Sequence, residues 1–375
     1  MNFGWNTEQT ALKESARKFL ENNSTTEHTL AVMQTESGFA PSTWTQICSE
    51  LGWAGLTIPE EFGGFGLPYS FLVALMEEMG RFLFSAPFFS SVCLGTNALL
   101  LCDNPSPKEA YLPHLASGEK RATLAHLEPV SAPDGKSDET RAEKTSHGYV
   151  LNGSKAFVLD GHTADLLLVS ARVDNTIELF AVDANSEGVT AQYTPTMDQT
   201  RKQAAIEFKN VVLSSDSRLS SSDNGARLVE QTRQLACVAL AAEQVGAAER
   251  CLEKSVEYAQ TRIQFGRPIG SFQAIKHKCA DMMVQVEAAR SAAYYAGWAA
   301  SESLDDLPLA AAQAKSYCSE AFYRCAAENI QIHGGIGFTW EHEAHLYFKR
   351  AQGSKALLGT PEEHRAFIAT HLGLS

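Results

Sequence analysis

The spacing of apolar residues changes twice along this chain, and no other feature of the sequence constrains the fold as much. From about residue 8 to residue 120, segments such as LKESARKFLE and YSFLVALMEEMGRFL place apolar residues three and four apart, as amphipathic helices do. From 121 to 224, segments such as YVLNGSKAF and AAIEFKNVVL show the period of two that is typical of strands. Helical spacing returns from residue 226 to the end.

These three parts predict an α+β protein with an N-terminal helical domain (1–120), a middle β domain (121–224) and a C-terminal helical bundle (225–375). Strands without intervening helices predict an antiparallel sheet or barrel and exclude a Rossmann domain. We expect a hairpin turn at Asn152-Gly153. In the last part, long helices are expected at 228–260, 272–301 and 308–332, and their short connections favour antiparallel neighbours.

Composition excludes several classes of function. The chain has 31 Lys and Arg against 44 Asp and Glu, so it offers no basic surface for nucleic acid. Its eight cysteines form no CxxC pair and are expected to be buried thiols. The uncharged stretch 82–102 is interrupted by Pro87 and several polar residues, so we expect buried core and no membrane span. The start MNFGWNTEQT has no secretory pattern, and a cytoplasmic protein is expected.

Metal binding is not expected either. His342 and His345 are three residues apart, but no third ligand candidate lies near them in the sequence. We expect both histidines on the surface of a helix.

Two stretches of the last part indicate a family. Residues 258–282 read YAQTRIQFGRPIGSFQAIKHKCADM, and residues 331–360 read QIHGGIGFTWEHEAHLYFKRAQGSKALLGT. Both resemble the acyl-CoA dehydrogenase family, and weaker similarities such as LGWAGLTIPEEFGGFG and VLNGSKAFVLDGHTAD extend over almost the whole chain. The resemblance implies that family's fold, FAD as cofactor, an acyl-CoA substrate from fatty-acid or steroid side-chain β-oxidation, and a tetramer of identical or related subunits. It also implies an electron-transferring flavoprotein as the usual acceptor.

The resemblance assigns the adenosine diphosphate half of FAD to Arg262 and Phe265, and it brings Gln331, Gly334 and Gly335 to the same pyrophosphate from the neighbouring subunit. Arginine offers planar, permanently charged donors to phosphate, and glycine lets backbone N–H groups approach. Taken singly, an arginine at a helix end is usually a solvated cap and a glycine pair is usually a C-cap, but the matching order favours the cofactor. The full set of expected cofactor residues is Arg262, Gln264, Phe265, Gln273, Gln331, Gly334, Gly335 and Thr360.

The chain departs from the family where the catalytic base belongs. In most members, a glutamate that removes the α-proton directly precedes the Gly-Thr found here as Gly359-Thr360, and that position is Leu358. A second group of members carries the glutamate on the first long bundle helix, where this chain has Ala236. Further departures concern the flavin ring, the CoA pyrophosphate and the substrate helix, and they are Leu127, Leu159, Phe157, Pro133 and Cys237.

Three hypotheses follow from this pattern. In the first, the chain is the partner subunit of a heteromeric α2β2 enzyme for bulky acyl-CoA substrates such as steroid side chains, and a related subunit supplies the base. In the second, it is a self-sufficient homotetramer that uses another carboxylate. Glu243 is then the best candidate, although it lies seven residues beyond Ala236, which is about 10 Å along a helix. In the third, it is a family member that does not dehydrogenate, such as a desulfinase or oxidase.

Overall fold

The computed structural model describes residues 4–129, 140–220 and 224–374, which form two compact units. The first unit comprises Met1–Ala31, Pro68–Phe84 and Gln234–Ser375, and the second comprises Val32–Leu67 and Ser85–Arg233. The N-terminal helical part of the sequence is therefore divided between the two units. The boundaries that we expected at residues 120 and 224 stay predictions.

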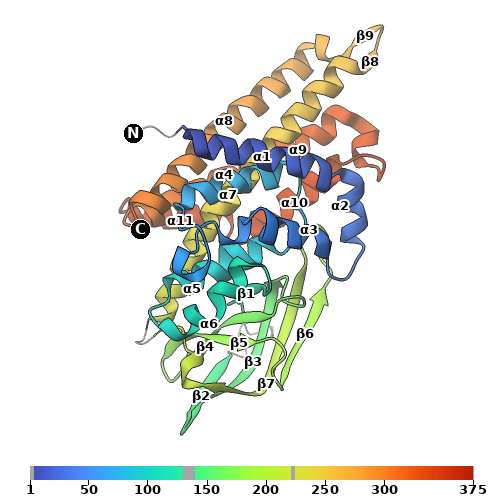
Figure 1. The fold of residues 1–375 in the computed structure, drawn as a ribbon. Coiled ribbons are helices and arrows are strands. Elements are labelled where there is room, and N and C mark those ends of the chain that lie inside the picture. The colour runs from blue at the N-terminus through green and yellow to red at the C-terminus, as the bar shows by residue number, and fades with distance from the viewer. Residues whose placement is uncertain (1–3, 130–139, 221–223, 375) are drawn as a thin grey trace. The chain divides into compact units, whose positions relative to one another are not determined.

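The first unit is helical (Figure 1). Its elements are α1 (Thr7–Asn23), the start of α2 (Thr26–Met33), α4 (Tyr69–Arg81), most of α7 (Gly225–Thr261), β8 (Ile263–Gln264), β9 (Arg267–Pro268), η6 (Ile269–Ser271), α8 (Gln273–Glu302), α9 (Leu307–His333), η7 (Gly334–Phe338), α10 (Ala344–Ala356) and α11 (Pro361–His371). The three long helices expected in this part are confirmed as α7, α8 and α9, with ends that differ from the prediction by a few residues.

Two glycines allow α4 and α7 to pack in close contact. A Cβ atom added at Gly246 would lie 1.7 Å from the carbonyl oxygen of Glu77, and one added at Gly80 would lie 1.9 Å from that of Glu243. Real side chains never approach a backbone oxygen so closely. The two backbones therefore touch at a place where any larger residue would force the helices apart.

The second unit consists of short helices and a sheet (Figure 1). The helical elements are α3 (Pro41–Thr45), η1 (Gln46–Glu50), η2 (Trp53–Gly55), η3 (Glu60–Phe62), η4 (Phe89–Thr96), α5 (Asn97–Leu101), α6 (Pro105–Ala116) and η5 (Ser215–Ser217). The strands are β1 (Ala122–Ala125), β2 (Arg141–Thr145), β3 (Gly148–Leu159), β4 (Leu166–Val173), β5 (Thr176–Asp183), β6 (Val189–Thr194) and β7 (Gln203–Ser214). They form one sheet in the order β1-β4-β2-β3-β7-β6, with β5 added to β4.

The sheet is mostly antiparallel, as expected, and β1 and β2 each pair with β4 in parallel. The hairpin turn predicted at Asn152-Gly153 is wrong, because β3 continues through both residues and the turn between β2 and β3 joins Thr145 to Gly148. The register shifts between Leu151 and Gly153 instead, which marks an irregularity of the kind that a β-bulge causes. A Cβ atom at Gly153 would lie 2.5 Å from the Cα atom of Thr140, so this glycine permits a close backbone approach.

Buried apolar residues are found where the sequence predicted them. The stretch 82–102 is buried over most of its length, in agreement with its interpretation as core. No helix within the described ranges is long and apolar enough to cross a membrane. All eight cysteines are free thiols, seven of them buried, and only Cys279 is partly accessible.

Candidate cofactor site

The hairpin between α7 and α8 carries three of the expected cofactor residues, Arg262, Gln264 and Phe265. It is formed by β8 and β9, and its turn residues Phe265 and Gly266 both have a left-handed backbone, with φ of 53° and 76°. This conformation is costly for phenylalanine. The Phe265 side chain is 91% exposed, so packing within the chain does not explain why an aromatic residue is kept there. Arg262 and Gln264 are exposed as well.

The C-terminal end of α9 carries Gln331, Gly334 and Gly335, and all three are exposed. Gly334 has φ of 65° and ψ of −141°, a conformation that essentially requires glycine. Gly335 has no positive φ, and a Cβ atom added there would meet nothing within 4 Å. Neither the backbone conformation nor a neighbouring residue of the chain requires glycine at position 335. The open space next to it would admit a group from outside the chain.

The hairpin and the end of α9 lie side by side. The ring of Tyr258, one turn before Arg262, stacks on His333, the residue before Gly334, with ring centroids 4.3 Å apart. We call the surface formed by residues 262–266 and 331–335 the cofactor end of the first unit. One chain therefore presents both groups together, and their assignment to different subunits stays a prediction.

Gln273 and Thr360 complete the expected set. Gln273 is exposed and begins α8 directly after the hairpin. Thr360 is the N-cap of α11, and its hydroxyl accepts a hydrogen bond from the backbone N–H of Glu363. Next to Thr360, the carbonyl of Pro361 accepts a bond from Ser316, which lies 17 residues before His333 on α9, or about 25 Å along the helix. Thr360 is therefore far from the cofactor end of its own chain.

The two positions at which the family carries its base lie close together in the first unit. The thiol of Cys237, next to Ala236, donates a hydrogen bond of 3.9 Å to the carbonyl oxygen of Leu358. Ala236 and Leu358 are both buried. Neither side chain can accept a proton, so this region of the chain has no base at either position.

Glu243 is buried and forms an ion pair. Its Oε1 atom accepts a bond of 3.0 Å from Nη1 of Arg350 on α10, and the two side chains are only 5% and 2% exposed. The sequence analysis did not identify Arg350 as the partner, because the two residues are 107 positions apart. A carboxylate that neutralises a buried guanidinium is stabilised in its charged form, which makes it a weak base.

In the second unit, two of the departures from the family lie on the surface. Leu127 and Phe157 are 44% and 55% exposed, and the N–H of Ala156 donates to the carbonyl of Leu127, so the two residues are neighbours. Leu159 is buried and offers no side-chain donor. Pro133 lies outside the described residues. The exposed surface around Leu127 and Phe157 is therefore apolar.

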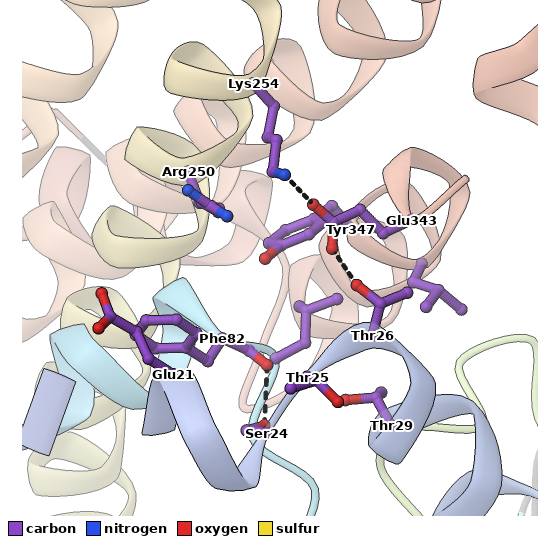
Figure 2. A pocket seen from close by; sticks show the side chains of 12 residues that line it. Glu21, Ser24, Thr25, Thr26, Thr29, Phe82, Arg250, Lys254, Glu343 and Tyr347 are labelled. Atoms are coloured by element: carbon purple, nitrogen blue, oxygen red, sulfur yellow. Dashed lines mark hydrogen bonds and ion pairs between the residues drawn. The ribbon is translucent and has the colours of Figure 1, made fainter. Parts of the chain in front are cut away.

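Figure 2 shows a pocket of about 260 Å³ in the first unit, lined by residues of α1, α2, α7 and α10. Two of its charged groups, Lys254 and Glu343, pair with each other. Glu343 lies 3.2 Å from Nζ of Lys254 and accepts a hydrogen bond from the hydroxyl of Thr26. None of the expected cofactor residues lines this pocket, and its paired charges leave little attraction for the phosphates of a dinucleotide.

The histidines of the HEAH sequence differ from the expectation. His345 is buried in the first turn of α10 with its ring against Trp340, so its placement on a helix surface is wrong. His342 is half-buried against His333. Burial lowers the pKa of His345 to about 4, which keeps this ring neutral. No group of three potential metal ligands occurs in the part of the chain that the structure describes.

Comparison with known proteins decides the family. Sequence models of the acyl-CoA dehydrogenase N-terminal, middle and C-terminal domains match residues 6–119, 124–211 and 223–373. The chain belongs to the acyl-CoA dehydrogenase family. Members of this family are FAD-dependent oxidoreductases, and the helical, β and helical order of the fold is theirs.

Individual relatives cover nearly the full length. The chain is 35% identical to the acyl-CoA dehydrogenase IpdE2 of Mycolicibacterium smegmatis over 95% of its own length and 96% of the relative's. Among solved structures, it resembles the ChsE4-ChsE5 complex from Mycobacterium tuberculosis with a TM-score of 0.91 and 28% identity, covering 100% of both chains. The butyryl-CoA dehydrogenase of Megasphaera elsdenii gives a TM-score of 0.91 and 27% identity, covering 99% of this chain and 100% of the other.

Proposed function

We propose that this chain is the partner subunit of a heteromeric acyl-CoA dehydrogenase, in which it shares FAD with a related subunit that carries the catalytic base. One observation carries the proposal. The two positions at which this family places its glutamate converge near the Cys237 and Leu358 contact, and both are apolar. A related subunit would have to supply the carboxylate that removes the α-proton.

The cofactor end supports a contribution to FAD binding. Arg262 would bind the pyrophosphate through its planar donors, and Gly334 and Gly335 would let backbone N–H groups approach it. Phe265 would offer an exposed ring face. The side-chain amides of Gln264, Gln273 and Gln331 would donate hydrogen bonds. Bound FAD supplies the acceptor for the hydride that leaves the β-carbon. The residues of this chain would hold the dinucleotide half of the cofactor, while Leu127 and Leu159 would offer the flavin ring no side-chain donor.

Glu243 belongs to the alternative in which the chain works alone. Its pairing with Arg350 and the distance of about 10 Å along α7 from the Ala236 position both argue against proton transfer by this residue. We therefore assign Glu243 a structural role and place the chemistry of proton abstraction in the related subunit.

The substrate class follows from the relatives. The ChsE4-ChsE5 structure is a complex of two different chains, and a further similar structure, at 29% identity and a TM-score of 0.87, is described as a steroid acyl-CoA dehydrogenase formed by Tcur3481 and Tcur3483. By analogy we propose a bulky acyl-CoA thioester as the substrate, with an electron-transferring flavoprotein as acceptor and the cytoplasm as location.

Co-expression tests the proposal. The chain is produced alone and together with a family member from the same organism that retains the glutamate, and native mass, bound FAD per chain and reduction by an acyl-CoA are measured. We expect a stable mixed tetramer that contains FAD. An acyl-CoA should reduce the flavin only in this mixed assembly. A lone homotetramer that binds one FAD per chain and is reduced by an acyl-CoA would refute the partner role and favour the self-sufficient enzyme.

A further inference from the structure

Lys315 is a fully buried lysine in α9, within the first unit. It has 0% exposure, and the residues that precede it in the helix are mainly alanines. The Nζ atom donates three hydrogen bonds, to Oγ of Ser319 at 2.9 Å, to the carbonyl of Gly359 at 3.0 Å and to the carbonyl of Lys355 at 3.2 Å. An ammonium group has three donors, so these three acceptors match it completely.

A charge in this position costs stability. Burial lowers the pKa of Lys315 to about 8, because the charged form loses its hydration. An apolar side chain of similar length would avoid this cost but would leave the three acceptors without their donor, so the two effects offset each other. The lysine is therefore poorly explained as a contribution to stability, and its three bonds indicate a different role.

Two of the three bonds fix a single short loop. We call residues 355–360, which are the last two residues of α10 and the connection to α11, the base loop, because Leu358 occupies the position of the family's base. Leu358 has φ of 61°, a left-handed conformation that is unfavourable for leucine. Its own carbonyl is in contact with Nε2 of His364 at 3.1 Å, so the carbonyls of three loop residues are held by side chains. The loop ends at Thr360, the expected cofactor residue at the start of α11.

We propose that Lys315 is a positioning residue that holds the base loop in its strained conformation and thereby places Thr360 for contact with an FAD that the cofactor end of another subunit holds. The proposal rests on the proposed function only for the cofactor contact. The fixing of the loop by Lys315 is a property of the chain itself and can be measured without cofactor or partner.

Hydrogen exchange and FAD affinity test this role with Lys315→Met and the matched control Lys355→Met. The control removes a lysine of the same loop whose Nζ lies over the ring of Tyr323. We expect Lys315→Met to speed amide exchange in residues 357–360 by about tenfold or more, the change that follows loss of a bond from a charged donor. The midpoint of thermal unfolding should change little, because removal of the buried charge offsets the loss of its three hydrogen bonds. In the mixed assembly, the dissociation constant for FAD should increase about tenfold, and Lys355→Met should change neither quantity.

The outcomes separate the possible roles. Parallel losses of unfolding midpoint and FAD affinity would indicate a merely structural lysine, and unchanged loop exchange would overturn the proposal. If Lys315→Met does not fold, the wild-type chain still tests the proposal, because exchange at 357–360 as fast as in an unstructured peptide would contradict a fixed loop. If the wild-type assembly binds no FAD, the proposed function fails while the exchange experiment still tests Lys315.

Discussion

The ion pair between Glu243 and Arg350 gives a prediction that separates a structural carboxylate from a catalytic one. The atoms are 3.0 Å apart, and at an effective dielectric constant of about 20 two unit charges at this distance attract each other by about 5 kcal/mol. Glu243→Gln keeps the shape of the side chain and removes its charge, which leaves the Arg350 guanidinium buried without this counter-charge. Loss of one partner of a buried pair typically costs about 3–5 kcal/mol. At roughly 2 °C per kcal/mol for a large domain, the thermal midpoint should fall by about 6–10 °C.

The assay combines a double-mutant cycle with turnover. Unfolding is measured for Glu243→Gln, Arg350→Met and the double variant, which should recover much of the loss because no lone charge remains. Glu230→Gln is the control, because it removes a carboxylate from an exposed pair on the same helix and should cost less than about 1 kcal/mol. Turnover per bound FAD in the mixed assembly should remain close to that of the wild type. A drop in kcat of about 100-fold or more in Glu243→Gln, with an unchanged midpoint, would show that Glu243 transfers a proton and refute our interpretation.

Four further predictions concern other parts of the chain. Gly246→Ala should destabilise the protein by about 3 kcal/mol in urea unfolding, since its Cβ atom would lie 1.7 Å from a carbonyl oxygen of α4, and an unchanged midpoint would contradict the contact. In the native protein, a thiol reagent should modify one cysteine before the seven buried ones, and mass spectrometry should identify it as Cys279. Arg262→Ala should raise the dissociation constant for FAD about 10- to 150-fold, and wild-type affinity would exclude a phosphate contact. Burial lowers the pKa of His126 to about 4, below its value near 6.5 in the unfolded chain. Protonation of this one group should therefore lower the free energy of unfolding by about 2 kcal/mol from pH 7 to pH 5. The fall measured by urea unfolding should be smaller in His126→Gln.

The sequence predicted the large elements because their periods persist over many residues. The helices at 228–260, 272–301 and 308–332 were found close to their true ends, since amphipathic spacing over seven or more turns leaves little choice. A pattern of only two residues predicts local structure less reliably. Asn152-Gly153 has the composition of a hairpin turn, but the chain uses its glycine to pass close to Thr140, a contact that depends on tertiary structure.

The candidate site was predictable only where it depends on local motifs. Residues 262–266 and 331–335 could be named from the sequence, and the structure brings them together through the Tyr258 and His333 stack. Arg350 and Lys315 could not, because their partners lie 107 and about 40 positions away, and no periodicity encodes such pairs. A lone lysine in the alanine-rich stretch LPLAAAQAKSYCSEAF was the one available indication of a buried cation.

Gly335 has a consequence for how variation in this protein should be interpreted. A survey of substitutions that scores only the folding of the isolated chain should tolerate most residues at position 335, because nothing within 4 Å opposes a side chain. A survey that scores the growth of cells dependent on the complete enzyme should reject them. The positions that tolerate substitution in the first survey but not in the second would then identify the surface that contacts a cofactor or another subunit.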